Sequence, residues 1–412
     1  MAIDAPIRPE NSLLCIAAQS AEGSPAVPSA ATDAIPFETD SLDYNGPFRS
    51  EATTEANGSF VASAPMVVGQ PATISFRSRL KGAGPGVAYT ASVRPPLHVP
   101  LQICGMLGQF VAAIAAAALT AGTAQSATLG ASAPATAQAL RGVPLLLTGA
   151  PAAGRASLIA DYTAGKVATL TDVFGSALSA TNQAAVPATW TYAGTTPSDA
   201  ASRASMHPCA TVYLYEDGVL HQWQDCRGTV TYEGAAGQPG FAVFNLTGVY
   251  MGRVDAAMPT NPVVAGHSAP LLVQGAGTQP AFQINRRGLA ISRWSINPQG
   301  SLETPDDPNS TYGFAGGQIA GRTPMLELDP LTTLVATRNS LADIAAFAQH
   351  VASIQMGSVA GNRVSIMVPV GQPVETTPGK RGKLRSETLR YQLLTPGRDN
   401  ANRDGDFVLA FS

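Results

Sequence analysis

Residues 209–234, CATVYLYEDGVLHQWQDCRGTVTYEG, constrain the fold most because they have the pattern of a β-hairpin. Apolar and polar residues alternate on both sides of Glu216, Asp217 and Gly218. An Asp-Gly pair between alternating runs is a strong signal for a tight turn between two strands. We therefore expect two strands around this turn and a third strand after Arg227 and Gly228.

The same kind of pattern recurs along most of the chain. Short apolar or alternating runs are separated by Gly, Pro and Asn turn signals, which predicts a mainly β protein. Further strands are expected at 12–19, 70–82, 142–149, 186–194, 239–254, 280–288, 290–300, 322–330, 362–370, 386–395 and 406–412.

Three segments have the spacing or composition of helices instead. Residues 101–119 and 339–356 are rich in helix formers with apolar residues at helical spacing, and 158–180 predicts one or two short helices. In the 339–356 segment, Asn339 or Ser340 is a suitable cap. Its apolar face would consist of Leu341, Ile344, Ala345, Phe347, Ala348, Val351 and Ile354.

The length of 412 residues favours more than one domain. A strand followed by a helix occurs in each half, which predicts two tandem related domains, each a β-sandwich flanked by one helix. We place the first domain at 1–119 and the second at 206–412. Residues 120–205 begin with an Ala-rich segment of low complexity and are predicted to be an insertion with short helices.

Charged residues are few and unevenly spread. They form 13% of the chain, against roughly 25% in an average soluble protein, so contacts between identical subunits are expected to cover much of the surface. Residues 1–60 carry nine acidic and two basic side chains, whereas 376–403 carry seven basic and two acidic ones. These are either two solvated charged regions, or one end of a subunit meets the opposite end of the next.

Nothing in the sequence predicts secretion or a membrane span. The N-terminal residues lack a basic region followed by an apolar core, and the apolar run 110–122 is too short to cross a bilayer. The four cysteines form no CxxC pair. Cys209 and Cys226 would lie nearly opposite one another in the hairpin, where a disulfide is geometrically possible, but we expect thiols because cytoplasmic synthesis keeps them reduced.

No motif for catalysis or for a cofactor is found. The GxSxG pattern is absent, and the five histidines do not have metal-ligand spacing. Asp306 and Asp307 stand between prolines and indicate a rigid turn rather than a calcium loop, and glycines 82–86 lack the Lys-Ser/Thr pair of a phosphate loop. The basic run 379–387 favours an exposed loop between subunits over a nucleic-acid site. The sequence predicts no enzyme and no cofactor.

Several segments resemble a known family. In the N-terminal part these are IPFETDSLDYNGPFRSEATTEANGSF, GQPATISFRSRLKGAG and LHVPLQICGMLG. In the C-terminal part they are the hairpin with the strand that follows it, GRTPMLELDP, GNRVSIMVP and RDGDFVLAFS. In this order of turns and strands the chain resembles the major tail tube proteins of long, non-contractile-tailed bacteriophages or of a prophage. Residues 120–205 depart from the simplest members.

The resemblance implies a structural virion protein with a β-sandwich or barrel tail-tube fold. Such proteins form stacked rings around a channel through which double-stranded DNA passes into the host, and two-domain members form trimeric rings with pseudo-sixfold symmetry. The expected partners are other copies of the chain, transiently the DNA, and the tail tip, tape measure and tail terminator proteins. The expected location is the virion tail, and the host cytoplasm during assembly.

Charge asymmetry suggests which residues take part in such an assembly. The candidates for the lumen or for ring contacts are the acidic residues Glu38, Asp40, Asp43, Glu51 and Glu55. The candidates for a basic loop between rings are Lys380, Arg381, Lys383 and Arg385. The alternative is a β-sandwich adhesion module that binds a receptor or carbohydrate on a virion or cell surface. The low number of tryptophans and the missing secretion signal count against that alternative.

Overall fold

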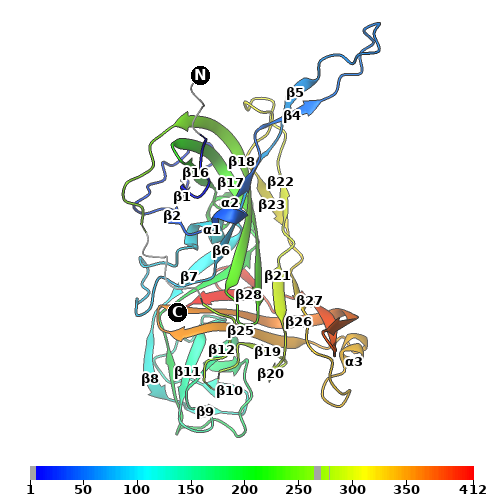
Figure 1. The fold of residues 1–412 in the computed structure, drawn as a ribbon. Coiled ribbons are helices and arrows are strands. Elements are labelled where there is room, and N and C mark those ends of the chain that lie inside the picture. Colours follow the sequence, from blue (N-terminus) through cyan, green and yellow to red (C-terminus); the bar gives the residue numbers. More distant parts are fainter. Residues whose placement is uncertain (1–5, 264–270, 278) are drawn as a thin grey trace.

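The computed structural model describes residues 6–263, 271–277 and 279–412. The molecule is elongated and built almost entirely of strands (Figure 1). The described strands form sheets of seventeen, seven, two and two members. The prediction of a mainly β protein with few helices is confirmed.

Eight strands of the largest sheet form a continuous antiparallel series, called here the eight-stranded sheet. In pairing order they are β3 (Asp43–Tyr44), β6 (Ala72–Arg79), β18 (Gly240–Asp255), β17 (Val219–Ala235), β21 (Arg293–Asn297), β24 (Met325–Leu328), β27 (Leu384–Leu393) and β26 (Asn362–Arg381). Figure 1 shows β17 and β18 running along the molecule and β26 and β27 running across it, so the sheet twists strongly.

One face of this sheet is buried and the other is exposed, because side chains alternate along a strand. The buried face includes Phe76 of β6 and Phe244 of β18, whose rings stack with centroids 5.0 Å apart. Tyr232 and Trp294 are also almost completely buried. The residues between them, such as Arg77 and Glu233, are partly exposed. The sheet is therefore a core layer on one side and a polar surface on the other.

The remaining strands of the seventeen-stranded sheet pair with this series or with one another. They are β1 (Ser12–Ala18), β2 (Ala34–Ile35), β7 (Met106–Val111), β15 (Thr189–Thr195), β16 (Ala210–Glu216), β19 (Phe282–Ile284), β20 (Arg287–Gly288), β25 (His350–Val359) and β28 (Arg403–Phe411). The helix α1 (His98–Ile103) contributes Leu101 and Ile103 to the same core.

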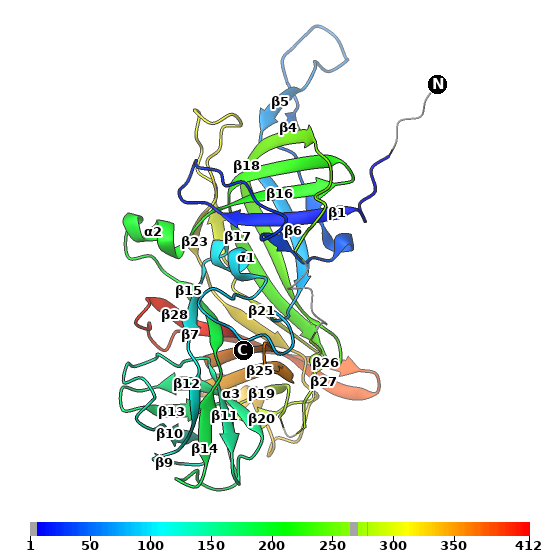
Figure 2. The same ribbon diagram turned by 90° about the vertical axis from the view of Figure 1, so that its left-hand side faces the viewer.

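Residues 114–186 form a separate lobe below the main body (Figure 2). Its seven strands are β8 (Ile114–Ala118), β14 (Gln183–Val186), β11 (Pro144–Thr148), β12 (Arg155–Tyr162), β13 (Val167–Leu170), β10 (Ser126–Thr128) and β9 (Ala121–Gly122). The lobe has its own apolar core, in which Leu145, Tyr162 and Leu170 are completely buried. The prediction of short helices at 158–180 is wrong, because residues up to 170 belong to β12, β13 and the turn between them, and 171–180 are irregular.

The predicted domain boundaries do not coincide with the ends of the sheets. Strands on the two sides of residue 206 are neighbours in one sheet: β1 pairs with β16, β6 with β18, and β15 with β28. The lobe of residues 114–186 begins six residues before the predicted insertion of residues 120–205 and ends nineteen residues before the end of that range, and α2 (Ala200–Met206) lies after the lobe.

The two long predicted helices are wrong in most of their length. In 101–119, α1 ends before Gly105, which has a φ of +75°, and β7 and β8 follow. In 339–356, α3 (Ser340–Ala345) is short, and β25 places Val351 and Ile354 in the core. The third strand predicted after Arg227 and Gly228 is not a separate strand, because β17 continues through a bulge to Ala235.

Two hairpins extend from the eight-stranded sheet. The connection from β3 to β6 contains β4 (Phe48–Glu51) and β5 (Met66–Gly69), which form the projecting arm in Figure 1, and the one-turn helix η1 (Thr39–Ser41) lies just before β3. The connection from β21 to β24 contains β22 (Ser301–Glu303) and β23 (Gln318–Gly321). The ring of Tyr312 in this second connection contacts the ring of Phe48 edge-on at 5.3 Å.

Candidate functional site

The exposed face of the eight-stranded sheet carries charges of both signs that are paired with one another. Arg77 contacts Glu233 at 3.0 Å and stacks on the ring of Phe241, with its guanidinium carbon 3.5 Å from the ring centroid. Arg79 donates a hydrogen bond of 3.1 Å to Glu38. These contacts join β6 to β17, β18 and the segment before β3.

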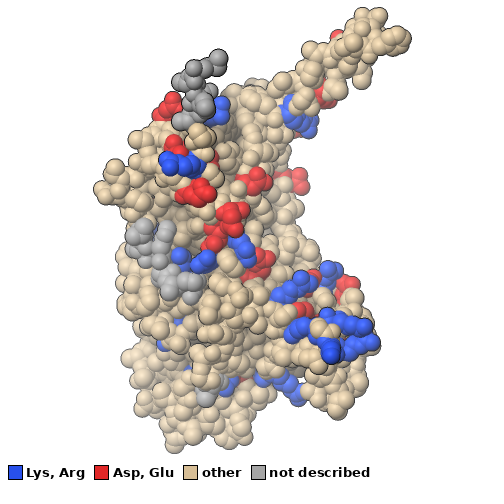
Figure 3. All heavy atoms as spheres, in the orientation of Figure 1, with Lys and Arg blue, Asp and Glu red and all other residues tan. Residues whose placement is uncertain are grey.

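The pairing continues across the second half of the sheet. Glu327 of β24 lies between two arginines, at 3.8 Å from Arg293 of β21 and 3.0 Å from Arg390 of β27. Arg390 also contacts Glu375 of β26 at 3.0 Å. In total this face pairs four arginines, Arg77, Arg79, Arg293 and Arg390, with four glutamates, Glu38, Glu233, Glu327 and Glu375. Figure 3 shows charged residues of both signs gathered over these strands.

The outer edges of the eight-stranded sheet are unpaired in the described part of the chain. At one end, β3 pairs only with β6. At the other end, residues 373–381 of β26 pair only with β27, because β25 pairs with β26 no further than Gly371. Pro373 and Pro378 stand in this free segment, a position typical of edge strands. Unpaired strand edges are sites at which another chain adds by backbone hydrogen bonding.

The five predicted acidic residues do not form one cluster. Glu38 lies on the exposed face, paired with Arg79, while Asp40 lies in η1 and Asp43 in β3. Glu51 is in β4 and Glu55 is in the loop of the arm. Among the described residues, no ion pair involves any of these carboxylates except that of Glu38.

The four predicted basic residues do lie together, at the tip of the β26–β27 hairpin. Lys380 stands opposite Arg385, and Arg381 stands opposite Leu384. Arg381 contacts Asp329 at 3.2 Å, whereas Lys380, Lys383 and Arg385 are exposed and form no ion pair with any described residue. Figure 3 shows this tip as a dense basic patch.

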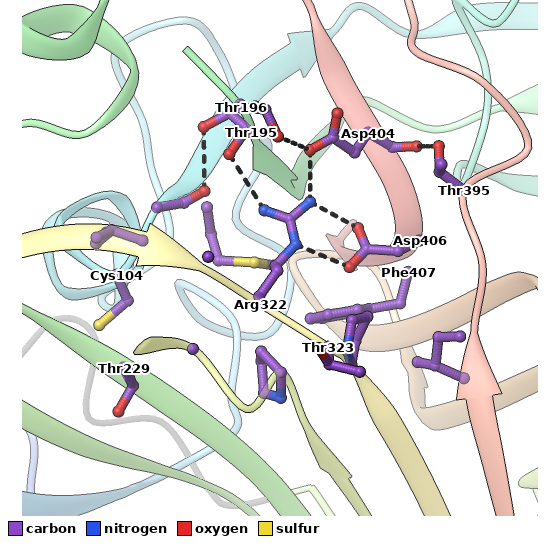
Figure 4. A pocket seen from close by; sticks show the side chains of 18 of the residues that line it. Cys104, Thr195, Thr196, Thr229, Arg322, Thr323, Thr395, Asp404, Asp406 and Phe407 are labelled. Carbon is purple, nitrogen blue, oxygen red and sulfur yellow. Dashed lines mark hydrogen bonds and ion pairs between the residues drawn. The ribbon is translucent and has the colours of Figure 1, made fainter. Parts of the chain in front are cut away.

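A pocket of about 600 Å³ lies elsewhere, between β28, β15 and β23. Apolar side chains such as Met106, Ile319 and Phe407 form much of its wall. In Figure 4, Arg322 points between Asp404 and Asp406. Its guanidinium donates to Asp404 at 2.7 Å, and to both carboxylate oxygens of Asp406 at 3.1 Å.

The charged groups at the centre of this pocket are paired with one another. Asp404 also accepts hydrogen bonds from Thr196 at 2.7 Å and from Arg398 at 3.0 Å. Burial raises the pKa of Asp406, and the contact with Arg322 opposes that shift. The carboxylates are thus engaged as acceptors, and the cluster clamps β28 to the connection before β24. The sequence predicts only that Arg322 and Asp406 begin strands, and it assigns no role to Asp404.

The histidines fit structural roles in the same way. Burial lowers the pKa of His207, whose Nε2 lies 3.1 Å from the carbonyl oxygen of Thr195. Burial also lowers the pKa of His98 to about 4, and its Nδ1 lies 2.7 Å from the hydroxyl of Tyr192. The described residues contain no group of three His, Cys, Asp or Glu side chains placed to hold a metal ion.

The cysteines of the described chain are free thiols, with Cys15, Cys209 and Cys226 buried. Burial raises the pKa of Cys209 to about 11 and that of Cys15 to about 12. The register of the hairpin places Cys226 opposite Ala210, so Cys226 and Cys209 are not direct cross-strand partners. None of the helices in the described ranges has the length and apolar character needed to cross a membrane.

Comparison with known proteins leaves the family open. No protein-family model matches the chain. A search of curated proteins also found no match.

Proposed function

We propose that the protein is a structural subunit that closes into rings and stacks into a tube, as in the tail tube of a long-tailed bacteriophage. The observation that carries the proposal is the eight-stranded sheet. It has one face buried in the core, one exposed face with balanced charge, and two unpaired edges. A sheet of this kind forms a barrel wall when its edges pair between copies.

The order of strands within the sheet supports closure by repetition. The series β3, β6, β18, β17 is followed by the series β21, β24, β27, β26. Each half contains a long hairpin, β17–β18 in the first and β26–β27 in the second. The second strand of each hairpin pairs with a shorter strand, β6 in the first half and β24 in the second. In the chain order, a helix follows β6 in one half and β24 in the other. This similarity of order is what two related halves predict.

The junction between the halves indicates how a neighbour would be added. Residues Tyr232, Glu233, Gly234 and Ala235 of β17 pair with β21, the first strand of the second half. In the second half, the strand equivalent to β17 is β26, whose residues 373–381 have a free edge. In the first half, the strand equivalent to β21 is β3. We infer that β26 of one copy pairs with β3 of the next. Three copies would then form a ring with six similar units.

The charges of the exposed face suit a channel wall. A wall of free arginines would bind DNA phosphates and release counterions, and each such contact strengthens binding. Here Arg77, Arg79, Arg293 and Arg390 are each matched by a glutamate within 4 Å. A face with balanced charges lets the polymer pass without holding it. Of the acidic residues predicted for the lumen or for ring contacts, Glu38 and Asp43 belong to this face, with Asp43 standing opposite Ser75 of β6.

Negative-stain electron microscopy and light scattering on the concentrated protein test this proposal. Rings or hollow tubes are the expected result, and the image symmetry separates three copies per ring from six. A protein that stays monomeric at every concentration tested contradicts self-assembly of the chain alone. A glycan-binding screen is then the next step, because a binding or adhesion module is the alternative.

A further inference from the structure

The direction of the strands places different features at the two rims of the eight-stranded sheet. Neighbouring strands are antiparallel throughout, so β6, β17, β24 and β26 all run in one direction. The arm of residues 48–69 enters at the start of β6. The loop after β24 and the tip of the β26–β27 hairpin follow the C-terminal ends of β24 and β26, which run in the same direction as β6. The arm therefore belongs to one rim, and the loop and hairpin tip belong to the opposite rim.

The arm presents apolar side chains to solvent. Phe60 at its tip is fully exposed, and Val61, Met66 and Val67 are more than half exposed. Its tip is nevertheless held in shape, because the Asn57 amide donates to the carbonyl oxygen of Val61 at 2.9 Å. An isolated two-stranded ribbon is at best marginally stable in water. A shaped apolar arm without a core of its own is typical of an element that packs against a partner.

The opposite rim carries an apolar surface that nothing in the described chain covers. We call it the receiver, and it consists of Leu334, Val335, Leu341 and Phe347, each at least 70% exposed. Phe347 has a φ of +52°, an unfavourable conformation for a bulky residue that here holds its ring outward. The predicted apolar helix face is thus divided, with Leu341 and Phe347 in solvent and Val351 and Ile354 in the core.

The receiver is joined to the basic hairpin tip. Arg338 donates to Glu387 of β27 at 3.1 Å, and the amide of Thr332 donates to the carbonyl oxygen of Arg385 at 3.0 Å. The rim is therefore apolar with a basic border. The arm carries Glu51 and Glu55 against a single basic residue, Arg49. The two surfaces match in apolar character and have complementary charge, which favours their association.

We propose that the arm of one copy docks on the receiver of a second copy in the adjacent ring. This inference rests on the proposed ring, and it adds the contact that joins one ring to the next. The interface is heterologous, because the two surfaces are different and lie on opposite rims. A heterologous contact that does not close on itself produces an open stack. The length of the stack is then limited by the supply of copies or by a terminating partner.

Two variants and a matched control test the contact. The arm variant carries Phe60→Ser and Val61→Ser, and the receiver variant carries Leu334→Ser and Val335→Ser. The control carries Val27→Ser, at a side chain that is 79% exposed and lies on neither surface. All the substituted side chains are exposed, so each variant should fold like the wild type, which circular dichroism checks. Negative-stain microscopy then measures the number of rings per stack.

The expected result is that the control forms tubes of wild-type length and each assembly variant forms single rings. Mixing preformed rings of the two variants should give pairs of rings and nothing longer. Each pair uses the intact arm of the receiver variant and the intact receiver of the arm variant. Tubes of wild-type length from either variant alone, or a mixture without ring pairs, would overturn the inference.

The controls keep the two proposals apart. Wild-type protein that forms rings but never stacks overturns the docking contact and leaves the ring intact. Wild-type protein that forms no ring overturns the proposed function itself.

Discussion

The ion pairs on the exposed face make a quantitative prediction about DNA. Replacing Glu38, Glu233, Glu327 and Glu375 by Gln frees the four arginines that they contact. These pairs are largely solvent-exposed, and each contributes at most about 1 kcal/mol to folding, so the variant should still fold. The variant face then offers four unpaired guanidinium groups per copy to phosphates.

The expected size of the effect follows from counterion release. Each phosphate contact contributes about 0.9 to the slope of log affinity against log salt concentration, so four contacts give a slope of up to about −4. The exposed Lys380, Lys383 and Arg385 of the hairpin tip are the same in both proteins, so the variant slope should be steeper than the wild-type slope by up to about 4. Fluorescence anisotropy with a short DNA duplex at a series of salt concentrations measures both quantities.

A matched control separates local charge from net charge. Glu10→Gln, Asp255→Asn, Glu303→Gln and Asp306→Asn remove the same number of carboxylates at exposed positions that have no ion pair in the described structure. The control should bind DNA as weakly as the wild type. Equal binding by the two variants, or no gain for the face variant, would refute the argument that paired charges keep this face from holding DNA.

Three further predictions concern the edge and the core. Pro378 has no N–H, so the backbone nitrogens of Pro378 and Thr376 face the free edge of β26. The substitution Thr376→Pro should therefore abolish rings, as measured by light scattering, with little change in melting temperature. Rings that persist in this variant would contradict the prediction. Arg322→Ala leaves Asp406 buried without its partner and should cost about 3–5 kcal/mol in urea denaturation, whereas a loss under about 1 kcal/mol would contradict the clamp. Because burial lowers the pKa of His98 to about 4, the folded state binds fewer protons there than the unfolded chain, and stability should fall as the pH drops from about 6.5 towards 4, by up to about 3 kcal/mol. His98→Gln should lose that part of the pH dependence in urea midpoints measured at pH 7 and pH 4.5, and an unchanged dependence would argue against it.

Strands were predictable wherever alternation was clear. The segment 70–82 contains β6 with Ile74 and Phe76 buried, and the turn at Asp217 and Gly218 is where the sequence places it. The hairpin forms because both turn residues adopt a positive φ, which Asp and Gly tolerate.

Helices were overpredicted because small residues satisfy more than one pattern. Alanine favours helices in isolation, yet Ala127, Ala168 and Ala184 are buried in the strands of the lobe. Burial against neighbouring strands outweighs an intrinsic preference worth less than about 1 kcal/mol per residue. The strand β25 illustrates the same effect, because pairing with β26 and β19 recruits residues that also had helical spacing.

The charge pairs of the exposed face could not be predicted, because their partners are far apart in sequence. Arg77 meets Glu233 and Glu327 meets Arg390 only through the register of strands that the sequence does not specify. The basic hairpin tip was predictable as a group because its residues are close together in the sequence, whereas the acidic candidates are spread over the face, the edge and the arm.

The most direct test of the central claim is a cryo-electron microscopy reconstruction of the assembled protein at a resolution that separates strands. The account predicts rings in which residues 373–381 of β26 pair with β3 of the neighbouring copy, so that the eight-stranded sheets join in one closed barrel with the arginine and glutamate pairs facing its channel. An assembly in which this segment of β26 stays unpaired, or in which the charged face points away from the axis, would contradict it.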